Sequence, residues 1–306
     1  MFKNATRTAS PVNRFSYAYL ALLTFGSLLL LRNTQAINPS IAGDSGVYLA
    51  AAQSFLDGDG LLDPSGLALT IFPPGYPLLL AFIATLGTSV VTAATIINLI
   101  AFALLISGTF LLARMTLGGT ALPIIAATLM ATSTSIYRVF SNAWTEPLFM
   151  VLMLAVLILL VDSINQDRVT WSSSLAMGVL ISLATTLRFV GVFIIPVLVI
   201  TLLYLTWRER KPGLVITTTA ISLVGFMTIG LHNLSLGAGF MGDRSASALT
   251  LQGSIEQFVR QLGVYIAPPE TTSLTNFAGA LLLVALIASV WLIYIHNSAS
   301  LYPLCL

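Results

Sequence analysis

The hydrophobic positions of this chain occur in long runs that short polar segments separate. A helix needs roughly 20 apolar residues to cross about 30 Å of hydrocarbon, and runs near that length predict eight membrane spans. They lie near residues 15–32, 91–113, 119–137, 147–161, 172–188, 189–207, 213–231 and 277–295. The apolar stretch 76–87 is too short for a crossing, so it predicts a re-entrant or interfacial helix.

Composition leads to the same class of protein. Hydrophobic residues make up 57% of the chain and charged residues 8%, whereas about a quarter of the residues in soluble domains are charged. We therefore expect an all-α polytopic membrane protein that forms a single transmembrane domain over residues 1–306. A net charge of +2 gives no indication of a nucleic-acid partner. The lone Cys305 excludes a disulfide framework and a thiolate metal site.

The distribution of charge orients the predicted spans. With eight crossings, the basic N-terminus, Arg114, segment 162–168 and the basic cluster 208–211 all lie on the cytoplasmic side, as the positive-inside rule expects. A further crossing at 76–87 would place cluster 208–211 outside, so eight spans are favoured. The prediction is an integral cytoplasmic-membrane protein with a cytoplasmic N-terminus and two long outer regions, about 33–90 and 232–276.

Asp44 is the leading candidate for chemistry, because an acidic side chain at a membrane boundary is costly and is a functional candidate by default. It directly precedes apolar residues at helical spacing over 47–55, which predict an amphipathic helix on the membrane surface. Two interpretations stay open, and both can hold. Asp44 caps this helix through its carboxylate, or it faces a cleft between spans and acts as a general base.

Two arginines are candidates for binding a phosphate. Arg188 interrupts an apolar stretch, where its guanidinium either meets phosphate oxygens or extends to the lipid headgroups. Arg244 follows closely spaced glycines, which permit the backbone to approach a ligand closely. The other interpretation of Arg244 is an ordinary outer loop in which it pairs with Asp243.

Glu146 precedes a proline, which is a helix-start signal. Its carboxylate either interacts with the positive end of that helix or works beside Asp44, orienting an acceptor or helping to hold a divalent cation. Two acids on separate loops make an incomplete shell for such a cation, so no metal site is predicted and cation dependence is left open. Tyr48, Tyr76 and His232 are candidates for lining a substrate site, although aromatic residues also gather at membrane interfaces.

Five short motifs follow one another in a set order along the chain. They are Asp44 to Tyr48, Phe72-Pro-Pro-Gly-Tyr-Pro77, Thr145-Glu-Pro-Leu-Phe149, Leu187-Arg-Phe-Val-Gly191 and Gly239 to Arg244. Together they resemble the GT-C superfamily of integral-membrane glycosyltransferases. More narrowly, they are similar to its bacterial branch related to protein O-mannosyltransferases and the lipid A aminoarabinose transferase. The resemblance covers roughly residues 15–250.

The resemblance implies transfer of a sugar from a polyprenyl-phosphate carrier to an acceptor hydroxyl on the outer face of the membrane, with inversion at the anomeric carbon. Asp44 matches the family's base, and Arg188 and Arg244 would bind the carrier phosphate. Relatives often have two adjacent acids where this chain has Asp44 and Ser45, so Glu146 or no residue supplies the second carboxylate. The sugar and the acceptor, whether lipid, polysaccharide or protein, are left open.

Relatives usually continue with further spans and sometimes an outer domain, so the resemblance also predicts a C-terminally truncated chain without a soluble C-terminal domain. The short C-terminus keeps a non-catalytic membrane scaffold or degenerate paralogue as an alternative function. A lipid or solute transporter is a third alternative. Transporters commonly have inverted repeats and interrupted helices near the bilayer midplane, whereas the acids of this chain gather in the outer segments.

Overall fold

The computed structural model describes residues 14–34, 39–206, 211–243 and 250–264, together with 276, 277, 280 and 281. In these residues the chain forms eleven α-helices and one 3-10 helix. It divides into two compact units, Met1–Arg244 and Ser245–Leu306. The prediction of one transmembrane domain over the whole chain stays a prediction.

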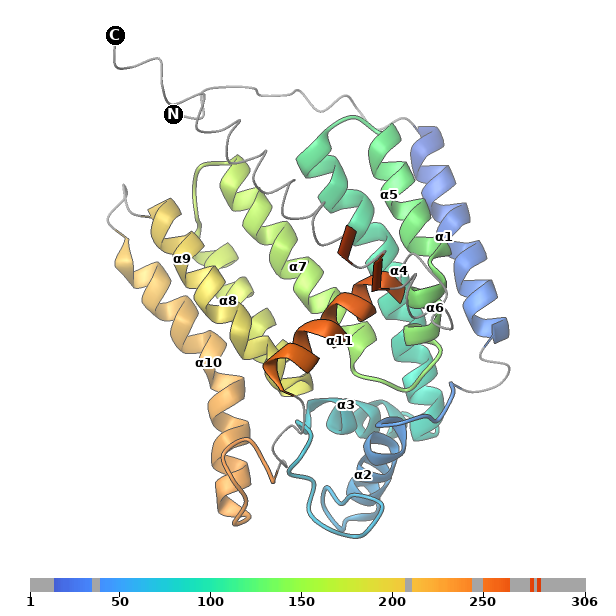
Figure 1. Cartoon of the computed structure of the whole chain (residues 1–306), viewed down its shortest axis with the longest axis vertical. Helices are drawn as coiled ribbons and strands as arrows, with labels where there is room; N and C mark the ends of the chain where they lie inside the picture. Colours follow the sequence, from blue (N-terminus) through green and yellow to red (C-terminus); the bar gives the residue numbers. More distant parts are fainter. Residues whose placement is uncertain are drawn as a thin grey trace. The chain divides into compact units, whose positions relative to one another are not determined.

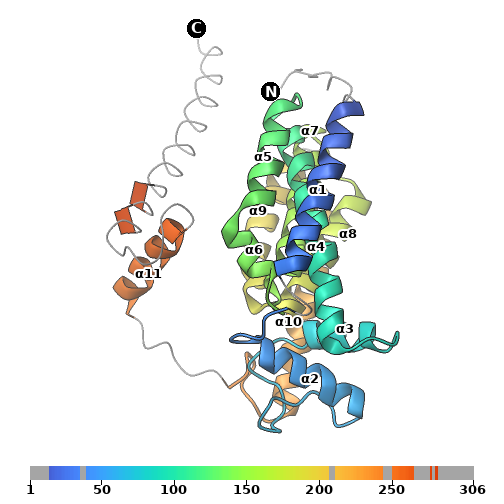
Figure 2. The same ribbon diagram turned by 90° about the vertical axis from the view of Figure 1, so that its right-hand side faces the viewer.

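The first unit is a bundle of long helices with two short helices, α2 and α3, at one end (Figure 1). Figure 2 shows the same bundle from the side on which α1 and α5 lie. The helices are α1 Arg14–Thr34, α2 Ser45–Asp57, α3 Gly75–Ala84, α4 Val90–Leu117, α5 Ala121–Thr132, α6 Thr134–Phe140, α7 Glu146–Asn165, α8 Trp171–Leu187, the 3-10 helix η1 Phe189–Phe193, α9 Ile194–Thr206 and α10 Pro212–Ser235.

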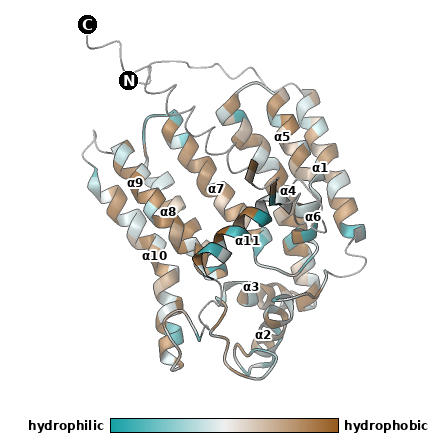
Figure 3. Ribbon diagram, in the orientation of Figure 1, coloured by the Kyte–Doolittle hydropathy of each residue, from teal (hydrophilic) through white to brown (hydrophobic). Residues whose placement is uncertain are grey.

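Five helical segments are long and apolar enough to cross a membrane: Phe15–Asn33, Val90–Leu117, Glu146–Asn165, Phe189–Thr206 and Pro212–Ser235. Each coincides with a predicted span, and Figure 3 shows mainly hydrophobic colours along these helices. The shorter apolar helices α5 and α8 occupy two further predicted ranges. The eighth range, 277–295, lies almost entirely outside the described residues. The chain is therefore an all-α polytopic membrane protein.

The predicted span 119–137 is two helices rather than one. Between α5 and α6, Ser133 has an extended backbone conformation, and its hydroxyl accepts a hydrogen bond from the Ile136 N–H at 3.4 Å. A serine in this position starts a new helix because its side chain satisfies a backbone donor that has no partner within the helix. The apolar pattern continues through the break, which explains why hydropathy does not detect it.

The predicted amphipathic helix is α2, and its apolar side is covered by protein. Tyr48 and Ala52 are buried and belong to one hydrophobic cluster with Tyr76 and Leu80 of α3. The rings of Tyr48 and Tyr76 meet edge to face, with centroids 5.5 Å apart. Part of the predicted stripe therefore packs inside the protein, whereas Phe55 at its end is exposed, and the position of α2 on a membrane surface stays a prediction.

Gly75 brings the start of α3 against the end of α8. A Cβ atom at this position would lie 2.5 Å from the backbone carbonyl oxygen of Thr186, so a larger residue requires the backbone to shift. This close approach sets α3 beside the residue that follows α8, Arg188.

The opposite end of the bundle contains two segments predicted to share the cytoplasmic side. The Asn165 side chain donates a hydrogen bond to the Met115 carbonyl oxygen at 3.3 Å, so the end of α7 lies beside the end of α4. Arg114 and segment 162–168 are thus at one end of the bundle, as predicted. Which side of the membrane this end faces stays a prediction.

The second unit contains helix α11, Leu251–Val264. It is amphipathic: Leu251, Ile255 and Phe258 are exposed apolar residues at helical spacing. On the polar side, the Gln252 side chain donates a hydrogen bond to Glu256 at 2.8 Å.

Candidate functional site

The structure brings most of the predicted site residues to one end of the first unit, where α2, α3 and the ends of α7, α8 and α10 meet (Figure 1). The residues found there are Asp44, Tyr48, Tyr76, Glu146, Arg188 and His232. Arg244 lies outside the described residues.

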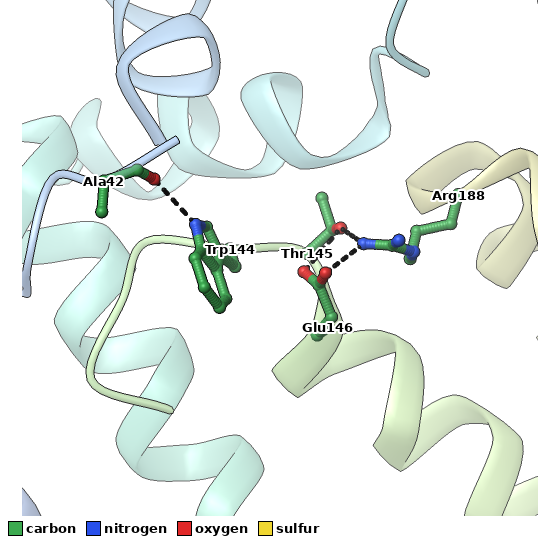
Figure 4. A network of polar contacts seen from close by, with 5 residues as sticks. All are labelled: Ala42, Trp144, Thr145, Glu146 and Arg188. Atoms are coloured by element: carbon green, nitrogen blue, oxygen red, sulfur yellow. Dashed lines mark hydrogen bonds and ion pairs between the residues drawn. The ribbon is translucent and has the colours of Figure 1, made fainter. Parts of the chain in front are cut away.

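Arg188 and Glu146 form an ion pair at the centre of this group. Arg188 follows α8 in an extended backbone conformation, and its Nη1 lies 2.5 Å from Glu146 Oε1. The same nitrogen donates a hydrogen bond to the hydroxyl of Thr145 at 3.1 Å (Figure 4). In the described part of the chain, Nε and Nη2 of Arg188 have no hydrogen-bond partner. The two charged side chains are 34% and 36% exposed, so the remaining face of the guanidinium is accessible.

Tyr48 lies next to this ion pair. Its side chain is 2% exposed, and its ring packs edge to face on Phe72 with centroids 5.2 Å apart. Burial raises the pKa of Tyr48 to about 12, and the negative charge of Asp44 adds to this effect. Hydrogen bonding with Thr145 and the positive charge of Arg188 act in the opposite direction. The Tyr48 hydroxyl is thus a protonated donor within electrostatic reach of both charged groups.

Asp44 stands at the N-cap position of α2, but its side chain makes no capping hydrogen bond. The interpretation of Asp44 as a side-chain cap is therefore wrong. Asp44 is exposed, and among the described residues its carboxylate has no hydrogen-bond or ion-pair partner. Gly43, with a φ of 56°, adopts the left-handed conformation that glycine tolerates best and turns the chain into α2. The carboxylate is thereby left available to a ligand.

The residues before Asp44 are attached to the loop that leads into Glu146. The Trp144 indole N–H donates a hydrogen bond to the Ala42 carbonyl oxygen at 2.9 Å (Figure 4). The Ser45 hydroxyl donates to the same oxygen at 3.0 Å. Ser40 and Asn142 form a one-residue parallel bridge. These contacts fix the separation between the two acidic residues, although they belong to distant parts of the sequence.

Asn98 in turn attaches this loop to the bundle. It is fully buried in α4, and its Nδ2 donates hydrogen bonds to the carbonyl oxygens of Phe140 and Asn142 at 2.8 Å and 2.7 Å. Side-chain hydrogen bonds between segments are a common way to fix helices in an apolar surrounding. The loop before Glu146 is therefore positioned from inside the bundle.

A cavity of about 770 Å³ lies beside the ion pair. Leu187, directly before Arg188, and Leu148, two residues after Glu146, belong to its wall. Of the lining residues, all but Thr186, Thr228 and His232 are apolar or glycine. The volume lies within the range of about 300–1,000 Å³ that is typical of ligand sites. Arg188 and Glu146 are not among the lining residues, so the cavity is an apolar space whose wall includes sequence neighbours of the ion pair.

Of the two remaining candidates for lining a site, His232 lies on the cavity wall and Tyr76 does not. His232 is exposed in the last turn of α10 and lies on the cavity wall. Its neighbour Asn233 is buried and donates hydrogen bonds to Phe240 at 3.2 Å and Thr70 at 3.5 Å, so Asn233 is the residue that fixes the end of α10. Tyr76 is fully buried, and its hydroxyl has no partner among the described residues.

Glu146 is engaged with Arg188, and within the described ranges no three His, Cys, Asp or Glu side chains come together as a metal site would require. Cation dependence, which the sequence leaves open, is not tested by this geometry.

Of three further residues that shape the site, Thr145 begins one of the quoted motifs, whereas Trp144 and Asn98 belong to none of them. One available signal was Asn98, a lone amide in an otherwise apolar span, because polar residues within spans commonly bond to neighbouring segments. Thr145 and Trp144 carry no comparable signal, since their roles depend on Arg188 and Ala42 reaching them.

A scan against protein-family models finds no match for this chain, and a search of curated proteins finds no relative. The resemblance to the GT-C superfamily therefore rests on the motifs alone, and what the chain is shown to be is a multi-helix membrane protein with five candidate spans.

Proposed function

We propose that this protein transfers a sugar from a polyprenyl-phosphate carrier to an acceptor hydroxyl on the outer face of the cytoplasmic membrane. The observation that carries the proposal is Arg188, which Glu146 and Thr145 orient and which directly follows Leu187 of the apolar cavity wall. A lipid-linked phosphate requires a cation next to room for a hydrocarbon chain. Asp44 offers an exposed carboxylate as the base, and the GT-C-like motifs favour sugar transfer as the reaction.

Arg188 would bind the carrier phosphate through Nε and Nη2, because a guanidinium presents parallel donors that match two phosphate oxygens. The first isoprene units would lie in the cavity, and the rest of the chain would lie among the membrane lipids. Arg244 would supply a second cation for the same phosphate. Glu146 is then a positioning residue for Arg188 rather than a second base.

The reaction forms one bond and breaks another at the anomeric carbon. Asp44 would accept the proton of the acceptor hydroxyl while that oxygen attacks the carbon from the face opposite the phosphate. The bond from the anomeric carbon to the phosphate oxygen breaks, and the oxygen leaves with the electron pair as polyprenyl phosphate. Arg188 stabilises the negative charge that develops there. Attack from the opposite face inverts the anomeric configuration.

Tyr48 would donate a hydrogen bond to the phosphate or to the sugar, since its phenol is protonated at neutral pH. His232 would line the site from α10, and the buried Tyr76 would support Tyr48 from α3. No role in proton transfer is needed for either residue.

The proposal includes the eight-span topology, with α3 as a re-entrant segment and the N-terminus in the cytoplasm. Single cysteines in a Cys305→Ser background test it. Asp59→Cys is expected to react with an impermeant maleimide from outside intact cells, and Gln166→Cys only after permeabilisation. The reverse pattern would exclude an outer site.

Asp44→Asn in proteoliposomes is the decisive experiment for activity. A panel of synthetic polyprenyl-phosphate hexoses and pentoses serves as donor, with membrane lipid, polysaccharide and protein fractions as acceptors. The variant is expected to lose transfer by about 10²–10⁴-fold, the usual contribution of a general base, while inserting normally. Asp59→Asn removes an exposed acid of the same outer segment and is the matched control.

Full turnover by Asp44→Asn would remove Asp44 as the base. If the wild type moves a labelled donor across sealed vesicles without forming a new glycosidic bond, the result would favour a transporter instead. Failure of the wild type to turn over any donor in the panel would favour the non-catalytic alternative.

A further inference from the structure

A second groove lies between α1 and the α5–α6 pair and shares no lining residue with the cavity beside Arg188. Its volume is about 590 Å³. The apolar part of its wall is formed by Leu22, Leu30 and Ala131, among others. A hydrogen bond from the Tyr137 hydroxyl to the Ser27 carbonyl oxygen at 3.2 Å connects the two sides. α1 and α5 pack against each other along the same side of the bundle (Figure 2).

The wall of this groove has a polar part formed mainly by α6 and the residues next to it. Thr134, Tyr137, Arg138 and Ser141 line it, and the hydroxyls of Tyr137 and Ser141 donate hydrogen bonds to backbone carbonyl oxygens. Arg138 is exposed, and its guanidinium has no acidic partner among the described residues. None of the residues that line the groove is acidic. The charge of Arg138 is thus available to a ligand.

Gly26 keeps the apolar part of the groove open. A Cβ atom at this position would have no neighbouring atom within 4 Å, so the space next to α1 is vacant here. Because α1 is a candidate membrane span, a groove on its side is accessible from the bilayer. An acyl chain is the natural occupant of apolar space that opens toward lipid.

We infer that this groove binds one anionic membrane phospholipid, with its phosphate on Arg138 and an acyl chain along Gly26. α6 directly precedes the loop 141–145 at the end of the bundle that carries Asp44 (Figure 1), and headgroup phosphates lie at such a boundary. An arginine near a membrane surface attracts anionic lipids by about 1 kcal/mol. The site does not depend on the proposed sugar transfer.

Native mass spectrometry of the purified full chain in detergent tests the inference, with dioleoyl phosphatidylglycerol and dioleoyl phosphatidylcholine titrated separately. The wild type is expected to retain one phosphatidylglycerol about fivefold more tightly than phosphatidylcholine, the ratio that about 1 kcal/mol represents. Arg138→Gln is expected to remove this preference without weakening phosphatidylcholine binding. Gly26→Leu is expected to weaken both lipids about tenfold or more, because the new side chain fills the groove.

Two matched controls test whether loss of a positive charge, or added bulk, elsewhere in the protein also changes lipid binding. Arg168→Gln removes a positive charge at the opposite end, and Val197→Leu adds bulk to an exposed position of α9. Both are expected to bind lipid as the wild type does. Gly26→Leu adds a side chain in open space and replaces glycine within a helix, so unchanged helicity and melting temperature are expected.

Equal affinity of the wild type for the two lipids would overturn the inference, as would full retention of both lipids by Gly26→Leu. Polyprenyl phosphate is a second anionic lipid, so its binding is measured in a separate titration. If Arg138→Gln weakens polyprenyl phosphate and leaves phosphatidylglycerol unaffected, the groove is a carrier site and the inference is wrong. If only Arg188→Ala loses binding of the polyprenyl-phosphate carrier, that result concerns the proposed sugar transfer and leaves the phospholipid groove unaffected.

Discussion

Glu146 Oε1 lies 2.5 Å from Arg188 Nη1, which joins the first turn of α7 to the residue that follows α8. Both side chains are about one-third exposed, and ion pairs in contact with water contribute only about 0–1 kcal/mol to stability. The pair therefore matters mainly for where the guanidinium points. The fixed orientation of the Arg188 guanidinium decides which ligand it can reach.

Glu146→Gln is expected to lower the free energy of unfolding by less than about 1 kcal/mol. Sugar transfer should fall by one to two orders of magnitude, because the guanidinium is no longer fixed and small misplacements are costly. A higher KM for the carrier is expected to account for most of this loss. Steady-state kinetics with the carrier varied measure the split between KM and kcat. Glu256→Gln on α11 is the matched control, and an unchanged KM would contradict the positioning role.

Tyr48→Phe should change the dependence of stability on alkaline pH. Since burial raises the pKa of Tyr48 from 10.0 to about 12, the folded protein retains a proton that the unfolded chain loses above pH 10. The stability of the wild type relative to Tyr48→Phe is therefore constant below pH 10. It decreases between pH 10 and 12, by about 3 kcal/mol at 1.36 kcal/mol per pH unit.

Thermal unfolding in detergent across this pH range gives the difference between the two proteins. Tyr17→Phe, at a position 56% exposed, is the control and is expected to follow the wild type. A difference that already varies between pH 6 and 9 would show that the Tyr48 phenol is not the titrating group.

Asn98→Ala should destabilise the protein by about 2–5 kcal/mol. The change removes both hydrogen bonds to the Phe140 and Asn142 carbonyl oxygens, and a buried polar group without a partner costs about 1–3 kcal/mol. Hydrogen exchange should also become faster in residues 140–145. Asn165→Ala is the matched control, since Asn165 is exposed and makes a single 3.3 Å bond. Equal effects of the two substitutions would refute the anchoring role of Asn98.

Gly75→Ala is expected to cost about 1–3 kcal/mol, the usual effect of overpacking. The added methyl group would meet the Thr186 backbone carbonyl at 2.5 Å, which forces α3 away from α8 and disturbs the surroundings of Arg188. Gly46→Ala in α2 provides the comparison, because its Cβ would meet no atom within 4 Å. That substitution should be neutral or slightly stabilising. Similar melting temperatures for both variants would show that α3 can move freely.

Hydropathy predicted the helices well because burial in lipid imposes a simple requirement on composition. Seven of the eight predicted ranges contain described apolar helices, and the short stretch 76–87 corresponds to α3. The alternating direction of successive spans was enough to place Asp44, Glu146 and Arg188 at one end. Hydropathy failed at Ser133, since a hydroxyl that starts a new helix leaves the apolar pattern unchanged.

The contacts within the site were less accessible to sequence reasoning. The pairing of Arg188 with Glu146 depends on how far α8 extends before η1 begins, which no local pattern determines. Asp44 does not cap α2 because its own backbone is helical, whereas a capping residue is typically extended. Such features follow from the packing of distant segments, whereas a single sequence reports local preferences.

Hydrogen bonds from Trp144 to Ala42, and from Asn98 to the Phe140 and Asn142 carbonyl oxygens, fix the segments that carry Asp44 and Glu146. The facing wall, made by α3 and the segment before it, is held by close packing instead: Tyr76 and Leu80 are buried in the cluster shared with α4, and Gly75 lies against Thr186. Its side chains Leu61, Leu78 and Leu79 line the cavity, so they limit the size of a ligand. Efforts to alter which substrate enters should begin with residues 61–79.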